Sequence, residues 1–231
     1  MKRNKLQRFA ENKENPHVIQ HNEIETDKAV DWLKAFSNIG HNESEGMQKL
    51  ILELGCGTGI FTVELAQKNP HFNYIGIDIK GSRLWKGASI AQEEKLSNVL
   101  FLRCQIENIE KYFKPEQVDG IYITFPDPRP KDRDEKRRLT HKRYLEVYKK
   151  ILRKTGSIFF KSDDDDLYFF TRDECLDNGF AVIHDTMHLH QEFSDLEVAQ
   201  VKTTYEKRFI EEGKKINYLS FRQDIPNLLH V

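Results

Sequence analysis

The chain has 231 residues, of which 38% are hydrophobic and 32% charged, the composition of an ordinary globular protein. No apolar run approaches the roughly 20 residues of a membrane-spanning helix, and the N-terminus lacks the apolar stretch of a secretory signal. With 36 basic and 37 acidic residues the net charge is −1, so affinity for nucleic acid requires a local basic patch. The three cysteines, Cys56, Cys104 and Cys175, form no CxxC pair, which argues against a disulfide framework and a cysteine-rich zinc site and favours a cytoplasmic location.

Basic residues are concentrated at the N-terminus, where residues 1–8 hold four Lys or Arg and no acid. This composition is typical of a mobile, solvated arm, so we expect a basic arm over residues 1–26. The remaining residues, 27–231, are expected to form a single domain, because a chain of this length can bury about 70% of its unfolded surface.

Short apolar runs alternate with segments of helical periodicity from residue 49 onward. Strands are expected at 49–54, 73–78, 99–104, 117–125, 157–161, 180–184 and 218–221. Helices are expected at 27–36, 61–67, 82–96, 144–152 and 167–176. The alternation predicts an α/β fold of the Rossmann-like kind: a doubly wound, mostly parallel seven-stranded sheet with helices on both faces. An antiparallel strand pair is expected at the C-terminal end.

The first of the expected β-α units contains a glycine-rich loop, Leu52–Gly59 (LELGCGTG). Gly55, Gly57 and Gly59 let the backbone turn tightly and approach a ligand at the start of a helix. Their G-x-G-x-G spacing differs from the G-x-G-x-x-G of dinucleotide sites, which argues against a nicotinamide-dependent oxidoreductase. An acid at the end of the next strand, Asp78, follows 19 residues after Gly59, where a ribose diol would be held.

The strand at 117–125 leads into a segment rich in proline and basic residues, PDPRPKDRDEKRR (126–138). In a doubly wound sheet, substrates bind at the carboxyl ends of the strands, where this segment lies. A carboxylate, Asp127, followed by a dense basic run suits a nucleobase to be gripped and a phosphate backbone to be neutralised. The residues expected on the phosphates are Arg133, Lys136, Arg137 and Arg138. The segment therefore predicts a nucleic-acid substrate.

The glycine loop, with Glu53 before its glycines and Asp78 after the next strand, resembles the cofactor-binding half of class I S-adenosylmethionine-dependent methyltransferases. The basic segment is similar to the signature of bacterial tRNA (guanine-N7-)-methyltransferases. FKSD (160–163), TTYEKRF (203–209) and the N-terminal KLQRFAENKENPHVIQ agree with the same family, so the resemblance covers nearly the whole chain. It implies S-adenosylmethionine as cofactor and tRNA as partner, with guanine 46 of the variable loop as target. No membrane and no obligatory protein partner are implied, and the chain is expected to be a monomer or a homodimer.

Residue roles follow from the positions that match the family. The expected cofactor contacts are Glu53, Gly55, Gly57, Asp78, Gln105 and Asp127. Among these the resemblance implies that Glu53 lies near the methionine end and Asp78 on the ribose. The expected substrate contacts are Lys131, Asp163, Thr203, Thr204, Tyr205 and Glu206. Asp127 is the residue expected to be catalytic.

The chain departs from the family pattern at a few positions. Arg129 stands where the family usually has tryptophan, Asp134 where it has histidine, and Gln105 where an acid or asparagine is more common. The four aspartates at 163–166 cannot all face one ion, so we expect them to cap the following helix and expect no metal site. The histidines within 184–190 lack zinc-site spacing and are expected to be structural or exposed.

The expected chemistry follows from the nucleophile. Guanine N7 carries a lone pair and no proton, so its methylation needs no general base, and catalysis should rest on positioning and electrostatics. The N1–H and N2–H₂ edge of guanine only donates, which suits the carboxylates of Asp127, Asp163 and Glu206. Two alternatives remain open. A methyltransferase acting on a small-molecule or protein nitrogen needs no basic run, and a non-enzymatic RNA-binding module leaves Glu53 and Asp78 without a role.

Overall fold

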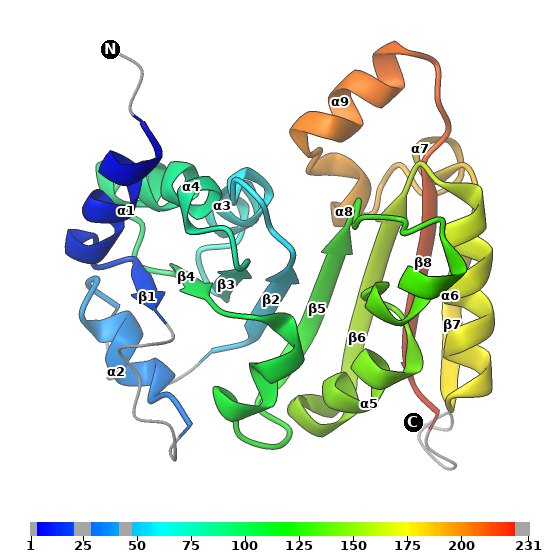
Figure 1. Cartoon of the computed structure of the whole chain (residues 1–231), viewed down its shortest axis with the longest axis horizontal. Helices are drawn as coiled ribbons and strands as arrows, with labels where there is room; N and C mark the ends of the chain where they lie inside the picture. The colour runs from blue at the N-terminus through cyan, green and yellow to red at the C-terminus, as the bar shows by residue number, and fades with distance from the viewer. Residues whose placement is uncertain (1–3, 21–28, 42–47, 225–231) are drawn as a thin grey trace. The chain divides into compact units, whose positions relative to one another are not determined.

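The computed structural model describes residues 4–20, 29–41 and 48–224. The chain divides into two compact units, Met1–Lys114 and Pro115–Val231 (Figure 1). The described residues contain eight strands, four in each unit, where the sequence predicted seven. All seven expected strands are present, and the additional one is β1, three residues long. No helix in the described part of the chain is long and apolar enough to cross a membrane.

The first unit contains a four-stranded parallel sheet in the order β1-β4-β3-β2. Its strands are β1 (Val18–Gln20), β2 (Leu50–Leu54), β3 (Asn73–Ile77) and β4 (Val99–Arg103). Its helices are α1 (Lys5–Glu14), α2 (Trp32–Ser37), α3 (Ile60–Lys68), α4 (Gly81–Glu93) and the 3-10 helix η3 (Ile106–Lys111). Helices α3 and α4 pack on β4, and α3 also contacts β3.

Strands β2 and β3 are buried along their whole length, as continuous apolar runs in parallel sheets usually are. Leu54 at the end of β2 is paired with Ile77 at the end of β3. Because parallel strands end at one edge of their sheet, this register brings the glycine loop and Asp78 to the same edge. The fold therefore joins the two sequence features that predicted a nucleotide-type ligand.

The N-terminal residues differ from the mobile arm that we expected. Residues 5–14 form α1, which packs against α4 (Figure 1). The buried Asn12 side chain donates to the carbonyl of Gly81 at 2.7 Å, and the Arg8 guanidinium lies 5.0 Å from the centre of the Trp85 ring. The boundary at residue 26 that we expected for the arm lies outside the described residues.

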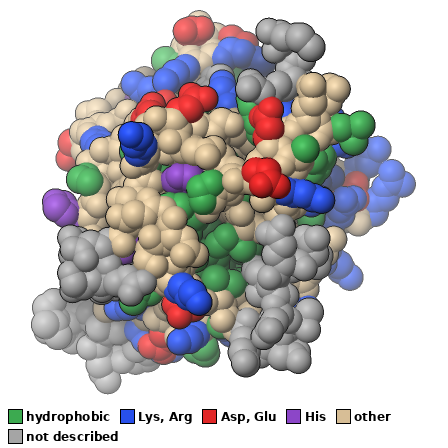
Figure 2. Space-filling model, turned by 90° about the vertical axis from the view of Figure 1, so that its left-hand side faces the viewer, with side chains coloured by type: hydrophobic (Ala, Val, Ile, Leu, Met, Phe, Trp, Pro, Cys, Tyr) green, Lys and Arg blue, Asp and Glu red, His purple; other side chains and the backbone are tan. Residues whose placement is uncertain are grey.

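On the face of the molecule drawn in Figure 2, basic and acidic side chains are interspersed.

The second unit contains a four-stranded mixed sheet in the order β5-β6-β8-β7, with β5 and β6 parallel and the β6/β8 and β8/β7 pairs antiparallel. Its strands are β5 (Val118–Thr124), β6 (Leu152–Ser162), β7 (Phe180–Thr186) and β8 (Asn217–Gln223). Its helices are η4 (Asp132–Arg137), α5 (Lys142–Ile151), α6 (Asp165–Asp177), α7 (Leu189–Glu192), α8 (Glu197–Gln200) and α9 (Thr204–Glu211). The predicted antiparallel pair at the C-terminal end is confirmed as β7 and β8.

The register of the second unit brings its predicted substrate segments to one edge of the sheet. Thr124 at the end of β5 is paired with Lys161 near the end of β6. The proline-rich loop follows Thr124, and Asp163 follows β6 directly. On the other side of β6, Lys161 is paired with Tyr218 of β8, shortly after the residues that connect α9 to β8. Three segments that are far apart in the sequence therefore meet around the end of β6.

Candidate functional site

The glycine loop of the first unit turns at three positions whose backbone conformation favours glycine. Gly55, Gly57 and Gly59 have φ values of 74°, 57° and 70°, in the left-handed region. A Cβ on Gly59 would lie 2.3 Å from a ring carbon of Phe101, so the turn closes directly onto β4. The nearest atom to a Cβ on Gly57 is 4.0 Å away. The loop therefore packs on the core on one side and leaves its backbone open to a ligand on the other.

Asp78 is fixed beside this loop by backbone donors. One carboxylate oxygen accepts from the amide of Gly57 at 3.0 Å, and the other accepts from the amide of Lys80 at 2.7 Å. The residue is only 9% exposed. Each carboxylate oxygen has a second lone-pair direction, so the group can still accept from a ribose hydroxyl. The structure thus fixes the orientation of this carboxylate beside the glycine loop through two backbone amides.

Glu53 lies in β2 just before the loop and is 3% exposed. Its carboxylate accepts a hydrogen bond from the hydroxyl of Thr62 in α3. Burial raises the pKa of the Cys56 thiol well above its usual value, and the nearby charges of Glu53 and Asp78 raise that pKa further. These carboxylates therefore give the loop a negative potential that suits a cationic group, and the neutral thiol is a filler rather than a nucleophile.

Gln105 follows β4 and is exposed, and its side-chain oxygen accepts from Asn108 at 3.3 Å. It is free to rotate toward a ligand at the cost of one exposed hydrogen bond. Around the glycine loop the first unit therefore presents two carboxylates held by hydrogen bonds, Glu53 and Asp78, and one exposed amide, Gln105. These groups can accept from hydroxyl and ammonium groups, and the amide can both donate and accept.

In the second unit, Asp127 lies in the loop that follows β5. Its side chain is 73% exposed and forms an ion pair with Arg129 at 3.1 Å. Phe125 and Arg129, on either side of it, have positive φ values of 48° and 50°. Non-glycine residues adopt this conformation rarely and at some energetic cost, which is typical of loops shaped for function. Sequence analysis assigned no role to Arg129, whereas the structure makes it the ion-pair partner of the expected catalytic carboxylate.

The basic run after this loop divides into two groups. The exposed side chains are those of Lys131, Arg133, Lys136 and Arg137. Arg138 differs from the expected phosphate contact, because its side chain is only 12% exposed. Its guanidinium donates to the carbonyls of Pro128 at 3.1 Å and Arg129 at 3.3 Å, and lies 4.3 Å from the centre of the Phe170 ring. Arg138 therefore fastens the loop that carries Asp127.

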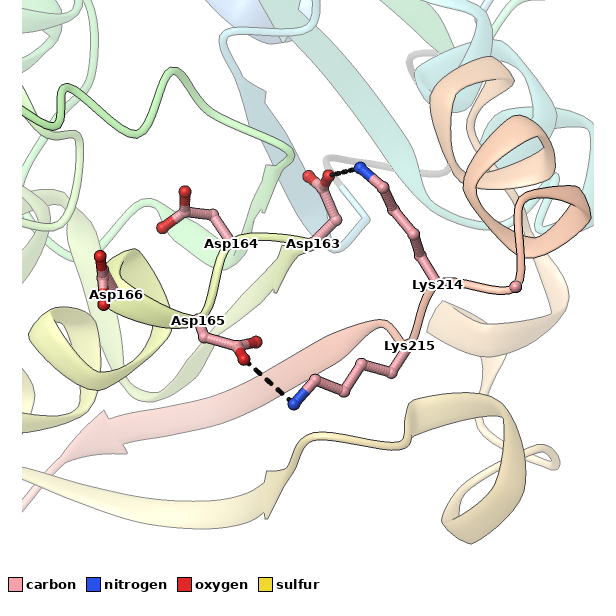
Figure 3. A pocket seen from close by; sticks show the side chains of 7 residues that line it. Asp163, Asp164, Asp165, Asp166, Lys214 and Lys215 are labelled. Carbon is pink, nitrogen blue, oxygen red and sulfur yellow. Dashed lines mark hydrogen bonds and ion pairs between the residues drawn. The ribbon is translucent and has the colours of Figure 1, made fainter.

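The four aspartates at 163–166 line an open pocket of about 520 Å³ together with Gly213, Lys214 and Lys215 (Figure 3). Asp163 forms an ion pair with Lys214 at 2.9 Å, and Asp165 forms one with Lys215 at 3.0 Å. Asp164 accepts from the amide of Leu167 at 2.7 Å, so the predicted capping of α6 is confirmed. A hydrogen bond from Asn217 is the main cause that lowers the pKa of Asp165.

The run Thr203–Glu206 forms the start of α9. Thr203 and Glu206 make a capping box, in which each side chain accepts from the backbone amide of the other. Tyr205 is 57% exposed, but Glu206 is 0% exposed and bonded to Lys161 and His190. A contact between Glu206 and the substrate stays a prediction, and the structure gives this carboxylate an internal partner that the sequence analysis missed. The signal that could have found it is a lysine inside an apolar strand run, SIFFK.

Solved methyltransferase structures share this fold. The chain matches an antibiotic-related methyltransferase with a TM-score of 0.61 and 19% identity, over 87% of this chain and 99% of that one. It matches the 16S rRNA methyltransferase KamB with a TM-score of 0.60 and 16% identity, over 85% and 94% of the two chains. A third match is a 16S rRNA (adenine(1408)-N(1))-methyltransferase variant from Catenulisporales acidiphilia, solved with its cosubstrate SAM. Its TM-score is 0.58 and its identity 11%, over 88% of this chain and 97% of that one. The predicted class I methyltransferase fold is thereby confirmed.

Closer similarities are found in sequence. Residues 47–219 match the family Methyltransf_4, described as "Putative methyltransferase". The tRNA (guanine-N(7)-)-methyltransferase of Christiangramia forsetii is 41% identical over 95% of this chain and 98% of its own length. The enzyme of the same name from Cytophaga hutchinsonii is 38% identical over 96% and 98%. The glycine loop, the fold and these similarities agree, and the chain belongs to the family of tRNA (guanine-N(7)-)-methyltransferases.

Proposed function

We propose that this protein transfers the methyl group of S-adenosylmethionine to N7 of guanine 46 in the variable loop of tRNA. The products are 7-methylguanosine and S-adenosylhomocysteine. The observation that carries the proposal is the 41% identity to a tRNA (guanine-N(7)-)-methyltransferase over 95% of the chain. The fixed carboxylate of Asp78 beside the glycine loop supports it independently. Because tRNA is the substrate, we assign the reaction to the cytoplasm.

The first unit supplies the cofactor contacts in this proposal. Asp78 accepts from the ribose hydroxyls, and its bonds to Gly57 and Lys80 keep it oriented. Glu53 attracts the ammonium of the methionine end, and Gln105 contacts the adenine. The backbones of Gly55 and Gly57 form the surface on which the cofactor lies. Asp127 of the second unit is the remaining proposed cofactor contact.

The second unit supplies the substrate contacts. Lys131 and Asp163 are proposed to bind the target nucleotide, together with the run Thr203–Glu206. The exposed cations on the phosphates are Arg133, Lys136 and Arg137. Arg138 supports tRNA binding indirectly in this assignment, since its guanidinium is engaged with loop carbonyls. Phosphate contacts of this kind give affinity without sequence preference, so the base has to be selected by other residues.

When bound, S-adenosylmethionine supplies a methyl group on a positively charged sulfur. Transfer of that methyl to the lone pair of N7 would release the sulfur as a neutral thioether and leave the positive charge on the purine. No residue has to remove a proton before the attack. The carboxylate of Asp127 accepts from the donor edge of guanine and favours the charge that develops on the ring. Asp127 therefore contributes by position and charge rather than by proton transfer.

The experiment is a transfer assay with unmodified tRNA and methyl-labelled S-adenosylmethionine, followed by digestion and mass spectrometry of the nucleosides. We expect label in 7-methylguanosine, mapped by chain cleavage to position 46. The matched control is the same tRNA carrying 7-deazaguanine at that position, which keeps the base-pairing edge and removes the nucleophile. Label in another nucleoside, or transfer only to protein or small-molecule nitrogen, would overturn the proposal.

A further inference from the structure

One lysine of the second unit is completely buried. Lys161 lies near the end of β6, and its side chain is 0% exposed. A buried ammonium is costly unless each of its three hydrogens finds an acceptor. The ammonium of Lys161 is 2.6 Å from a carboxylate oxygen of Glu206, 2.9 Å from the carbonyl of Val198 and 3.3 Å from that of Val201. The charge is therefore fully satisfied by α8, α9 and the turn between them.

The partner of this lysine fixes the start of α9. Glu206 is 0% exposed, and the oxygen that contacts Lys161 also accepts from the amide of Thr203 at 3.2 Å. Its other oxygen is 2.9 Å from the ring nitrogen Nε2 of His190 in α7. The capping box that begins α9 is thus bonded to β6 and to α7. Tyr205, in the same turn, is 57% exposed.

The backbone of the same lysine holds the loop that carries Asp127. The carbonyl of Lys161 accepts from the amide of Phe125 at 2.8 Å, two residues before Asp127. The Phe125 ring lies 5.9 Å from the lysine nitrogen and 5.7 Å from the ring of Phe209 in α9. Lys161 therefore touches the proline-rich loop with its main chain and α9 with its side chain.

The segment around Asp163, which follows β6, contacts the residues after α9. The nitrogen of Lys214 lies 4.3 Å from the centre of the Phe209 ring and 2.9 Å from the carboxylate of Asp163 (Figure 3). Asp163 is two residues after Lys161 in the chain. Phe125–Asp127, Ser162–Asp163 and Thr203–Glu206, which we call the three substrate segments, are thus linked in a closed set of contacts around Lys161.

We propose that Lys161 is a positioning residue that sets the three substrate segments relative to one another. It has no exposed atom with which to touch the substrate, so it acts only through Glu206 and Phe125. Without its ammonium, Glu206 would keep a buried charge with one partner fewer, and the first turn of α9 would move toward water. The proposal rests on the proposed function, because it assumes that these segments bind tRNA.

The test compares two lysines of one strand. Lys161→Met keeps the length of the side chain and removes its charge, and Lys154→Met makes the same change at an exposed position of β6. For Lys161→Met we expect the KM for tRNA to rise at least about tenfold, with the Kd for S-adenosylhomocysteine changed less than about twofold. Amide hydrogen exchange should accelerate in α9 and at Phe125. Lys154→Met should leave all three quantities unchanged.

The result that overturns the proposal is a folded Lys161→Met with normal KM for tRNA and normal exchange in α9. If Lys161→Met does not fold, the double variant Lys161→Met/Glu206→Gln removes both buried charges and is judged by the same exchange criterion. His190→Ala removes only the contact between His190 and Glu206, at a position whose side chain is 24% exposed. This variant should raise the amide exchange rate in α9 and leave that of Phe125 unchanged. If the wild-type protein methylates no tRNA, the proposed function fails, and hydrogen exchange still decides whether Lys161 orders the three segments.

Discussion

The carboxylates proposed for the cofactor and the carboxylate proposed for the chemistry are held in opposite ways. Asp78 is 9% exposed and accepts from two backbone amides, and Glu53 is 3% exposed with a hydroxyl partner. Asp127 is 73% exposed, and the partner of its carboxylate in the structure is Arg129, whose side chain is 34% exposed. Backbone donors in buried surroundings fix a group, whereas an exposed ion pair is worth about 1 kcal/mol or less.

This difference indicates two modes of binding. The groups of the first unit are arranged before the cofactor binds, so binding costs little reorganisation. The carboxylate of Asp127 has to leave Arg129 before it can contact a ligand, which is inexpensive because the carboxylate itself is largely exposed. A preformed cofactor site and an adaptable substrate loop predict that substitutions in the first unit weaken cofactor binding. Substitutions in the loop should instead reduce turnover.

Asp127→Asn should have the largest effect. The change keeps the size of the side chain and removes the anion, so turnover at saturating tRNA and cofactor should fall at least about 100-fold, as when one preorganised electrostatic contact is lost. Arg129→Ala is the matched control, because it removes the ion-pair partner and leaves the carboxylate, and should change turnover less than about fivefold. Steady-state kinetics measures both. Near-normal turnover of Asp127→Asn would make the carboxylate a loop-shaping residue.

Asp78→Ala should weaken cofactor binding, as expected for the first unit. It removes the ribose acceptor and frees the amide of Gly57, so the Kd for S-adenosylhomocysteine should rise at least about tenfold. Calorimetry measures the Kd, and thermal unfolding should show that the ligand no longer raises the Tm of this variant. If NAD raises the Tm of the wild type and S-adenosylhomocysteine does not, the cofactor assignment is wrong.

A third prediction compares the exposed and the buried cations of the basic run. Lys136→Ala/Arg137→Ala should leave stability unchanged and lower the slope of log affinity for tRNA against log salt by about 0.7 to 0.9 for each lost phosphate contact. Arg138→Ala should instead lower the free energy of unfolding by about 1 to 3 kcal/mol, because it leaves two loop carbonyls without their donor. Filter binding at several salt concentrations and urea unfolding distinguish the two. Identical behaviour of both variants would contradict the division.

The smallest effect concerns buried thiols, which both units contain. Burial raises the pKa of Cys104 to about 12 and raises the pKa of Cys56 and Cys175 as well. The folded state keeps these thiols protonated, while the unfolded chain loses their protons above its pKa of about 9. Stability is therefore fully present below pH 9 and falls as the pH rises toward 12, by up to about 1.4 kcal/mol per pH unit for each thiol.

Urea unfolding at pH 8, 9 and 10 measures this loss. Cys104→Ala should make the decline between pH 9 and 10 shallower, since one titrating group is removed. The same substitution should leave the shape of the pH profile below pH 8 unchanged. A decline that keeps its slope in this variant would assign the alkaline loss to other groups.

Much of the candidate cofactor site was predictable because its determinants are local. The glycines that need positive φ, the strand that precedes them and the acid at the next strand end are adjacent in sequence or spaced by one β-α-β unit. The cap of α6 by Asp164 was predictable for the same reason, since a capping side chain bonds three residues ahead. Periodicity likewise predicted seven of the eight strands in the described residues, all except the three-residue β1.

Other features needed the tertiary structure, because their partners are distant in the chain. Lys161 and Glu206 are 45 residues apart, and Lys214 and Asp163 are 51 apart. The cations of the basic run look equivalent in sequence. Arg138 differs from its exposed neighbours only because Phe170 and the loop carbonyls lie close enough to contact its guanidinium.

The sequence by itself determined the fold class, which depends on short-range patterns of apolar residues and glycines, and its ordered motifs determined the family. The tertiary structure decided which charged side chains face water and which are buried. The physical reason is that a charge leaves water only where acceptors from several distant segments converge on it, as they do on Lys161. No local pattern records that convergence, and here it lies around the end of β6.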